Sequence, residues 1–148
     1  MRRFVAGWMF CLLVAASGLA QTGTVGGDAA PLEKTEWRLV RLGDAPVTAN
    51  DLHQRHLAFD PATHRMSGSG GCNRISGGYT LKGQKLTFAH VMSTMMACEG
   101  VMDTEQNFLK ALGEVKRWRI AGRQLTLMDG SGKAVAVFEV GDSAVKVG

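Results

Sequence analysis

The chain has 148 residues, a length typical of one domain. Apolar residues make up 45% of it and charged residues 20%, which is the composition of a globular protein and excludes a low-complexity chain. The formal net charge of +4 is too small to indicate a nucleic-acid partner, which would need basic residues concentrated on one face. The 19 glycines favour turns and short strands over a helical bundle.

Residues 1–20 have the pattern of a secretory signal peptide. Arg2 and Arg3 precede the apolar run Phe4–Ala16, and Ser17–Ala20 supplies small residues before a cleavage site at Gln21. The alternative is a membrane anchor, but the run is shorter than the ~20 apolar residues of a span. Cys11 lies within the run and not at the cleavage site, which argues against a lipid anchor. We therefore expect a soluble periplasmic protein without a membrane span in the mature chain.

The mature chain is predicted to begin with a flexible linker over residues 21–34, which are rich in Gly, Thr and Ala. One domain follows over residues 35–140, and residues 141–148 form a tail. Alternating apolar and polar residues predict several short strands in the first half of the domain, with a loop over Gly43–Arg55 and a three-residue hairpin turn over Lys82–Gln84. These strands are Trp37–Leu42, His56–Asp60, Arg65–Gly71, Gly78–Leu81 and Lys85–Phe88.

One helix is predicted next, with Asp103 or Thr104 as its cap and Gly113 in its last turn. Its apolar side chains, Phe108, Leu109, Leu112 and Val115, share one face. Three more strands close the domain, at Trp118–Ile120, Leu125–Leu127 and Ala134–Val140, with turns at Gly122-Arg123 and Asp129–Gly132. Consecutive hairpins predict an α+β fold, in which one helix packs on a small antiparallel β-sheet of about eight short strands, curved or partly barrel-like.

Two cysteines, Cys72 and Cys98, remain after removal of the signal peptide. A pair of cysteines in an exported protein indicates a disulfide, which would close a loop of about 27 residues and stabilise the fold by about 3.5 kcal/mol. The alternative is two free thiols, one of them nucleophilic. Such a thiol needs a general base, and His90 is the candidate in sequence.

Methionines are concentrated in the segment from His90 to Met102, where Met92, Met95 and Met96 precede Cys98. Thioether, thiolate and imidazole groups together suit Cu(I). The alternative is that these methionines fill irregular gaps in the core. Zinc is not expected, because His53 and His56 are three residues apart in a polar loop and belong to no known ligand motif.

No enzyme motif is present, since Ser69 and Ser76 lack the glycines of a nucleophile elbow. The sequence therefore predicts a protein that is not an enzyme and has no cofactor. An apolar-ligand carrier is a separate hypothesis, in which large side chains line a pocket; the same side chains could equally form the core. They are Trp37, Phe59, Phe88, Met96, Phe108 and Trp118.

A basic stretch surrounds Trp118 near the end of the domain. Alternation places Arg117 and Arg119 on one strand face, opposite Trp118, with Lys116 and Arg123 at the two ends. The usual interpretation is a solvated outer face. The alternative is a contact with anionic lipid or with an acidic partner.

Two motifs around the cysteines resemble those of the META domain, the family of the heat-shock protein HslJ. The first is Gly-Cys-Asn-Arg followed by a Gly-Tyr turn, and the second is Thr-x-Met-Ala-Cys. The resemblance extends over Thr35–Val140. The motif residues are Gly71, Cys72, Asn73, Arg74, Gly77, Tyr79, Thr94, Met96, Ala97 and Cys98.

This resemblance implies a small envelope or secreted protein that is linked loosely to stress tolerance and has no established catalytic activity. The motif is then structural or a binding element, with Asn73 able to adopt a left-handed conformation and Arg74 able to bond open backbone carbonyls. We expect a non-enzymatic binding or interaction module of the envelope. Its partner would be an unknown protein or a small apolar ligand.

Overall fold

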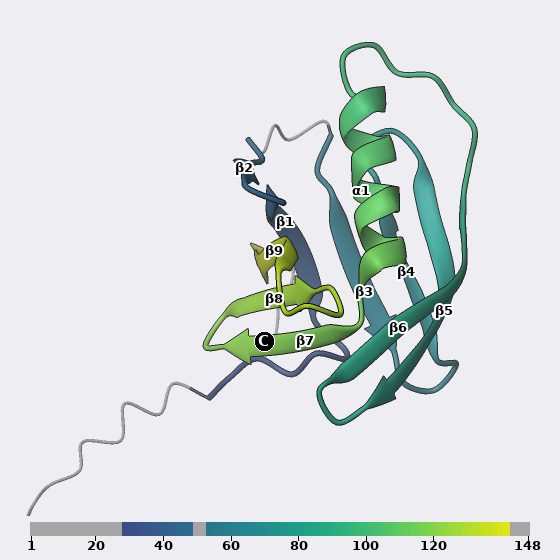
Figure 1. The fold of residues 1–148 in the computed structure, drawn as a ribbon. Coiled ribbons are helices and arrows are strands. Elements are labelled where there is room, and N and C mark those ends of the chain that lie inside the picture. Colours follow the sequence, from purple (N-terminus) through teal and green to yellow (C-terminus); the bar gives the residue numbers. More distant parts are fainter. Residues whose placement is uncertain (1–27, 49–52, 143–148) are drawn as a thin grey trace, which may run out of the picture.

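The computed structural model describes residues 28–48 and 53–142. The predicted signal peptide with Cys11, residues 21–27 of the predicted linker and residues 143–148 of the tail lie outside these ranges. Nine strands and one helix follow each other along the described chain (Figure 1). They are β1 (Glu36–Leu42), β2 (Ala45–Pro46), β3 (His56–Asp60), β4 (Arg65–Ser69), β5 (Arg74–Lys82), β6 (Lys85–Ser93), α1 (Met102–Glu114), β7 (Arg117–Ala121), β8 (Gln124–Met128) and β9 (Ala134–Val140).

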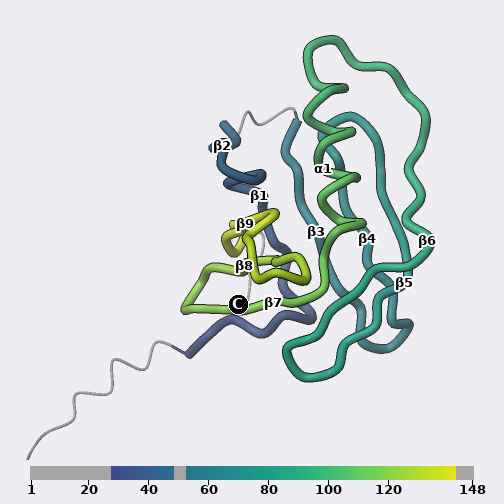
Figure 2. Tube along the Cα trace, viewed as in Figure 1, coloured from purple at the N-terminus to yellow at the C-terminus, as the bar shows by residue number. Residues whose placement is uncertain are grey.

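The strands form one antiparallel sheet that curves into a ring. Its order is β2-β1-β3-β4-β5-β6-β7-β8-β9, and β9 also pairs with β1, with Trp37 opposite Val140. The pairing of β6 with β7 is short, with Lys85 opposite Arg117. Helix α1 packs against β6, β9 and β1, beside the region where β6 and β7 diverge (Figure 2). The predicted α+β class with one helix on an antiparallel sheet is confirmed.

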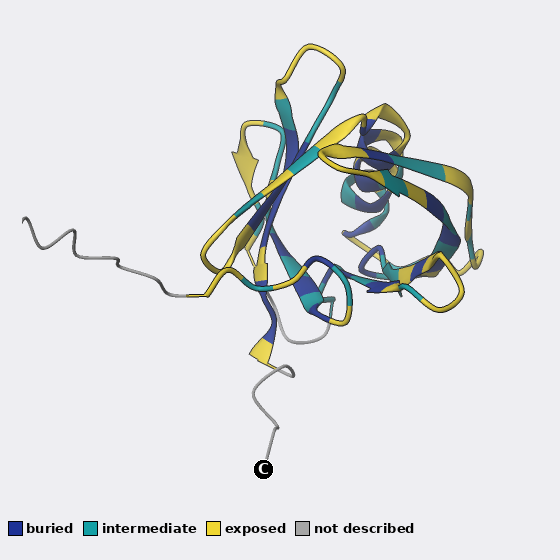
Figure 3. Cartoon of the chain, turned by 90° about the horizontal axis from the view of Figure 1, so that it is seen from below, coloured by how far each residue is buried: buried dark blue, intermediate teal, exposed yellow. Residues whose placement is uncertain are grey.

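The core lies between the inner face of the ring and the helix. Every second side chain of a strand points inward, so the alternating apolar residues of the strands meet there, as the buried stretches in Figure 3 show. Phe108 and Leu112 of the helix are fully buried, and Val115 is buried just beyond its end. The strand residues of the core include Trp37, Leu39, Leu57, Phe59, Met66, Ile75, Tyr79, Leu86, Leu125, Leu127 and Phe138.

Several predicted boundaries are wrong. Strands β5 and β6 are much longer than the predicted hairpin, and Lys82 pairs with Lys85, so the turn has two residues instead of three. Strand β4 ends at Ser69 instead of Gly71, and the predicted loop Gly43–Arg55 contains β2. These differences arise because pairing with a neighbouring strand extends β5 through Gly77 and Gly78, residues that would weaken an isolated strand.

The helix also begins differently from the prediction. Its N-cap is Val101, and no side chain caps it, so neither Asp103 nor Thr104 has the predicted role. Gly113 lies in the last turn, as expected. Glu105, an acidic residue of the first turn, is buried.

The ordered domain begins before Thr35. The backbone N–H of Ala30 donates to Gly122, and Leu32 is buried in the core. The indole Nε1 of Trp37 donates to the carbonyl of Leu32 at 2.8 Å. The prediction of a linker is therefore wrong for its last residues, because the indole of Trp37 holds them against the sheet.

Two glycines should respond oppositely to substitution by alanine. At Gly68 of β4 a Cβ atom would lie 2.0 Å from the carbonyl oxygen of His56 on β3, whereas at Gly113 it would meet nothing within 4 Å. We expect Gly68→Ala to destabilise the fold by about 1–3 kcal/mol, because the strands must separate. Gly113→Ala should stabilise it by about 0.5–1 kcal/mol through helix propensity. Urea denaturation of both variants checks this, and equal effects would contradict it.

Candidate functional site

Asn73 links three segments of the chain. Its Oδ1 accepts hydrogen bonds from Thr94 Oγ1 at 2.9 Å and from the backbone N–H of Met96 at 2.6 Å. Its Nδ2 donates to the carbonyl of Met96 at 3.0 Å and to Glu105 on the helix. Asn73 is not among the residues with positive φ, so it does not use the left-handed conformation that asparagine is able to adopt. Its role is that of a buried, fully used hydrogen-bonding group.

The carboxylate of Glu105 is the second part of this network. It accepts the backbone N–H groups of Cys72 at 2.9 Å and Asn73 at 2.7 Å, in addition to Asn73 Nδ2. Burial by itself raises the pKa of Glu105, but these hydrogen bonds and the charge of Arg55 bring the pKa below its ordinary value. The helix is thereby tied to the turn between β4 and β5.

The predicted disulfide is present in this network. Cys72 and Cys98 are bonded, with their Cα atoms 5.8 Å apart. It joins the β4–β5 turn to the segment that leads into the helix, beside the hydrogen bonds of Asn73. Because both sulfurs are in the disulfide, the alternative of a nucleophilic thiol is not realised in this structure.

The remaining motif residues divide into two groups. Gly71 has a φ of +113° and lies under the guanidinium of Arg55, where a Cβ atom would come within 3.2 Å of it. The backbone N–H of Arg74 donates to Thr94 Oγ1 at 3.1 Å, while its side chain is exposed. Ala97 is exposed in the segment just before Cys98.

Gly77 and Tyr79 lie further along β5, away from the disulfide. A Cβ atom at Gly77 would approach the carbonyl of Ala89 and the Cα of Val91 on β6, each at 3.1 Å. The hydroxyl of Tyr79 donates to Glu33 at 2.6 Å, and burial together with Glu33 raises the pKa of Tyr79. The structure thus assembles most of the motif into one structural network and places these two residues elsewhere.

The methionines before the helix are exposed, so the interpretation that they fill the core is wrong for them. Met92, Met95 and Met96 are 60%, 98% and 58% exposed. The Cu(I) hypothesis loses its thiolate, because Cys98 is in the disulfide. Among the described residues no group of three or more His, Cys, Asp or Glu side chains could hold a metal ion.

Oxidation should separate exposed from buried methionines. Met95 is almost fully exposed, whereas Met66 is 0% exposed in the core. With dilute hydrogen peroxide we expect Met95 to gain one oxygen atom first and Met66 last, because peroxide must reach the thioether. Peptide mass spectrometry over a time course measures both rates. Equal rates in the folded protein would contradict the burial of Met66.

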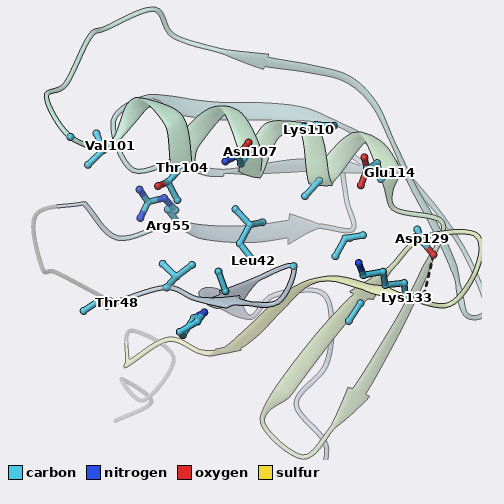
Figure 4. Close-up of a pocket in the computed structure, with 18 residues that line it drawn as sticks. Leu42, Thr48, Arg55, Val101, Thr104, Asn107, Lys110, Glu114, Asp129 and Lys133 are labelled. Atoms are coloured by element: carbon cyan, nitrogen blue, oxygen red, sulfur yellow. Dashed lines mark hydrogen bonds between the residues drawn. The ribbon is translucent and has the colours of Figure 1, made fainter.

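A cleft of about 680 Å³ lies on the other side of the helix. It is bounded by α1, by the β1–β2 turn and by the start of β9 (Figure 4). Its walls combine apolar and polar side chains. Arg55 and Thr104 lie at one end, Lys133 and Asp129 at the other, and Asn107 and Lys110 of α1 lie between them. The lining includes Leu42, Pro46, Val47, Thr48, Val101, Asn107, Lys110, Ala111, Glu114 and Val135.

Arg55 is the unusual residue of this cleft. Its side chain is 8% exposed, and its buried Nε has no hydrogen-bond partner. Burial lowers the pKa of Arg55, and the charge of Glu105 raises it. Both oxygens of Glu105 are already used by Cys72 and Asn73. The residue nevertheless lines the cleft and forms no ion pair in the described residues, so this end of the cleft carries a positive charge that suits an anionic ligand.

Sequence reasoning missed this cleft because its residues come from distant segments. Arg55 is the last residue of a predicted loop, and Lys110 and Glu114 lie in the predicted helix but outside its apolar face. None of the six large side chains proposed for a carrier pocket lines the cleft. Trp37, Phe59 and Phe108 are buried in the core instead.

A closed antiparallel sheet with one helix, joined by the disulfide and the Asn73–Glu105 network, defines a small β-rich domain with a lateral cleft. The family model of the META domain matches residues 30–142. The chain therefore belongs to the META domain family. The match begins near Ala30, where the structure also shows the ordered domain beginning.

Solved structures show the same fold. An NMR structure of a protein from Burkholderia xenovorans is 28% identical, with a TM-score of 0.61 over 75% of this chain and 84% of its own. A second NMR structure is 25% identical and has a TM-score of 0.61. The match covers 76% of this chain and 93% of that protein's chain. A crystal structure of a DUF4847 family protein from Bacteroides vulgatus is 16% identical, has a TM-score of 0.56 and shares the fold. The match covers 73% of this chain and 93% of that protein's chain.

No protein of curated function matches the sequence. In the described ranges, no helix is long and apolar enough to cross a membrane.

Proposed function

We propose that this protein is an exported, non-enzymatic binding module of the cell envelope with a role in stress tolerance, and that its cleft binds a small organic anion. The observation that carries the proposal is Arg55, a largely buried cation that lines one end of the cleft and forms no ion pair in the described residues. A carboxylate or phosphate in the cleft would supply an oppositely charged partner, and arginine pairs with such groups in a bidentate geometry.

The apolar residues of the cleft support an apolar portion of the same ligand. Leu42, Val47, Ala111 and Val135 are among its lining residues. Ligand sites typically combine an apolar wall with a few polar groups that fix orientation. The alternative is a carrier of a neutral apolar ligand, which these four side chains also favour. The two functions differ in whether binding depends on Arg55.

Isothermal titration with decanoate and with decanol separates the two functions. For the anion site, decanoate should bind and decanol should bind far more weakly. Arg55→Met should weaken decanoate binding by about 10–100-fold, as expected for loss of a charge-assisted hydrogen bond. Thr104→Trp, which fills the cleft from a half-exposed position, should block binding while leaving the core intact. Arg65→Met, outside the cleft, is the matched control.

Three results would overturn this function. Equal binding of decanol and decanoate would favour the neutral carrier, and binding unaffected by Thr104→Trp would place the site elsewhere. Labelling of the folded protein by a serine- or cysteine-directed activity probe would contradict a non-enzymatic role. Export is tested by fractionation, in which the periplasmic protein should have the mass of a chain beginning at Gln21.

A further inference from the structure

We propose that the outer face of β5, β6 and β7 binds the surface of a bilayer that contains anionic phospholipid. Lys82 pairs with Lys85 across the β5–β6 hairpin, and Lys85 pairs with Arg117 on β7. Residues directly opposite on antiparallel strands point to the same face. The three cations therefore form one row across three strands, and Arg119, two residues along β7, extends it. We call these four residues the basic row.

By itself, the basic row lowers the stability of the sheet. Like charges directly opposite each other destabilise a sheet, and all four side chains are exposed. None of them forms an ion pair in the described part of the chain, where the ion pairs are Arg38–Asp142 and Lys133–Asp44. Asp129 follows Met128, which lies opposite Arg117, but its Oδ1 accepts hydrogen bonds from Ser131 and Lys133 in its own turn.

The backbone holds the basic row in place. The indole Nε1 of Trp118 donates to the carbonyl of Gly83 in the β5–β6 turn at 2.8 Å. The backbone N–H of Trp118 donates to Gln84, and that of Leu86 donates to Lys116. These bonds join β7 to the end of the hairpin, so the positive charges are presented together on a fixed surface. Lys116 and Arg123 add two exposed cations at the ends of β7.

The shape of this surface favours a membrane over a small anion or a nucleic acid. None of the four residues lines the cleft beside α1 or the smaller one near Arg38 and Asp142, and all four lie on an exposed strand face. Trp118 and Ile120 are on the opposite face of β7 and pack partly against the core, so among the described residues of β7 no aromatic ring shares the face of the cations for stacking on bases. An anionic bilayer needs only an exposed, positively charged surface. Each cation close to the bilayer increases the partitioning of the protein onto it by about five-fold.

Vesicle co-sedimentation tests the proposal with the purified protein. Vesicles of equal parts phosphatidylcholine and phosphatidylglycerol should bind the protein, and vesicles of phosphatidylcholine alone should not. The double variant Lys85→Gln with Arg117→Gln should bind about 30-fold more weakly, since two cations are removed. Arg41→Gln with Arg65→Gln removes the same charge from β1 and β4 and should change binding by less than about two-fold. High salt should release the wild-type protein.

Two outcomes would overturn the proposal. Equal losses in the two double variants would show that net charge alone attracts the protein to the vesicles. Absence of binding to anionic vesicles, together with binding to RNA or to an acidic protein that depends on Lys85 and Arg117, would assign the basic row to another partner. Circular dichroism of each variant verifies that the sheet is intact.

Discussion

Replacement of Cys98 by serine is expected to lower the free energy of unfolding by about 2–5 kcal/mol. The bond joins residues 26 apart in the sequence, so its loss allows the unfolded chain many more conformations. The same bond adjoins the hydrogen bonds that Asn73 makes with Met96. Loss of the disulfide should therefore act on both states. It should increase the conformational freedom of the unfolded chain and loosen the segment before the helix in the folded protein.

Thermal unfolding with and without dithiothreitol measures this effect. The reductant should lower the melting temperature of the wild-type protein and leave that of Cys98→Ser unchanged. Ellman titration of protein freshly isolated from the periplasm should detect no free thiol. A melting temperature that the reductant leaves unchanged in both proteins would show that the bond does not stabilise the fold.

Replacement of Glu105 by glutamine is expected to destabilise the protein by about 2–4 kcal/mol. The carboxylate accepts the backbone N–H groups of Cys72 and Asn73 at one oxygen and Asn73 Nδ2 at the other. A glutamine amide has one oxygen, and its NH₂ group would face a donor. At least one buried donor then loses its partner, and Arg55 loses the nearby negative charge.

This substitution should also change the pH dependence of stability. The pKa of Glu105 is below its ordinary value of 4.5 in the folded protein, so the unfolded state binds a proton more readily. The contribution of Glu105 is fully present above pH 4.5 and is lost as pH falls through the lower folded pKa. Wild type should therefore lose more stability than Glu105→Gln on acidification.

Urea denaturation at neutral and acidic pH tests both parts of this prediction. Glu99→Gln is the matched control, because Glu99 is exposed in the segment before the helix. It should leave stability at neutral pH almost unchanged. Equal stability of Glu105→Gln and the control at neutral pH would contradict the role assigned to the buried carboxylate.

Local patterns were sufficient to predict the class of fold. Alternation of apolar residues identified strands such as His56–Asp60, because each half-buried strand must place one set of side chains in the core. Helical spacing identified Phe108 and Leu112 as a buried face for the same reason. The two cysteine motifs led to the META family, and the pairing of Cys72 with Cys98 followed from their number in a chain that is predicted to be exported.

Long-range contacts decided the site, and no local pattern contains them. The buried role of Glu105 could not be predicted from the helix alone, because its partners Cys72 and Asn73 lie more than thirty residues earlier. Arg55 became a cleft residue only when α1 packed beside the β1–β2 turn. The basic row depends on the register of β6 with β7, which places Lys85 opposite Arg117. The sequence by itself determined which residues are apolar, cationic or able to cross-link. Tertiary packing decided which of these residues contact each other, because hydrogen bonds and strand register join segments that are distant along the chain.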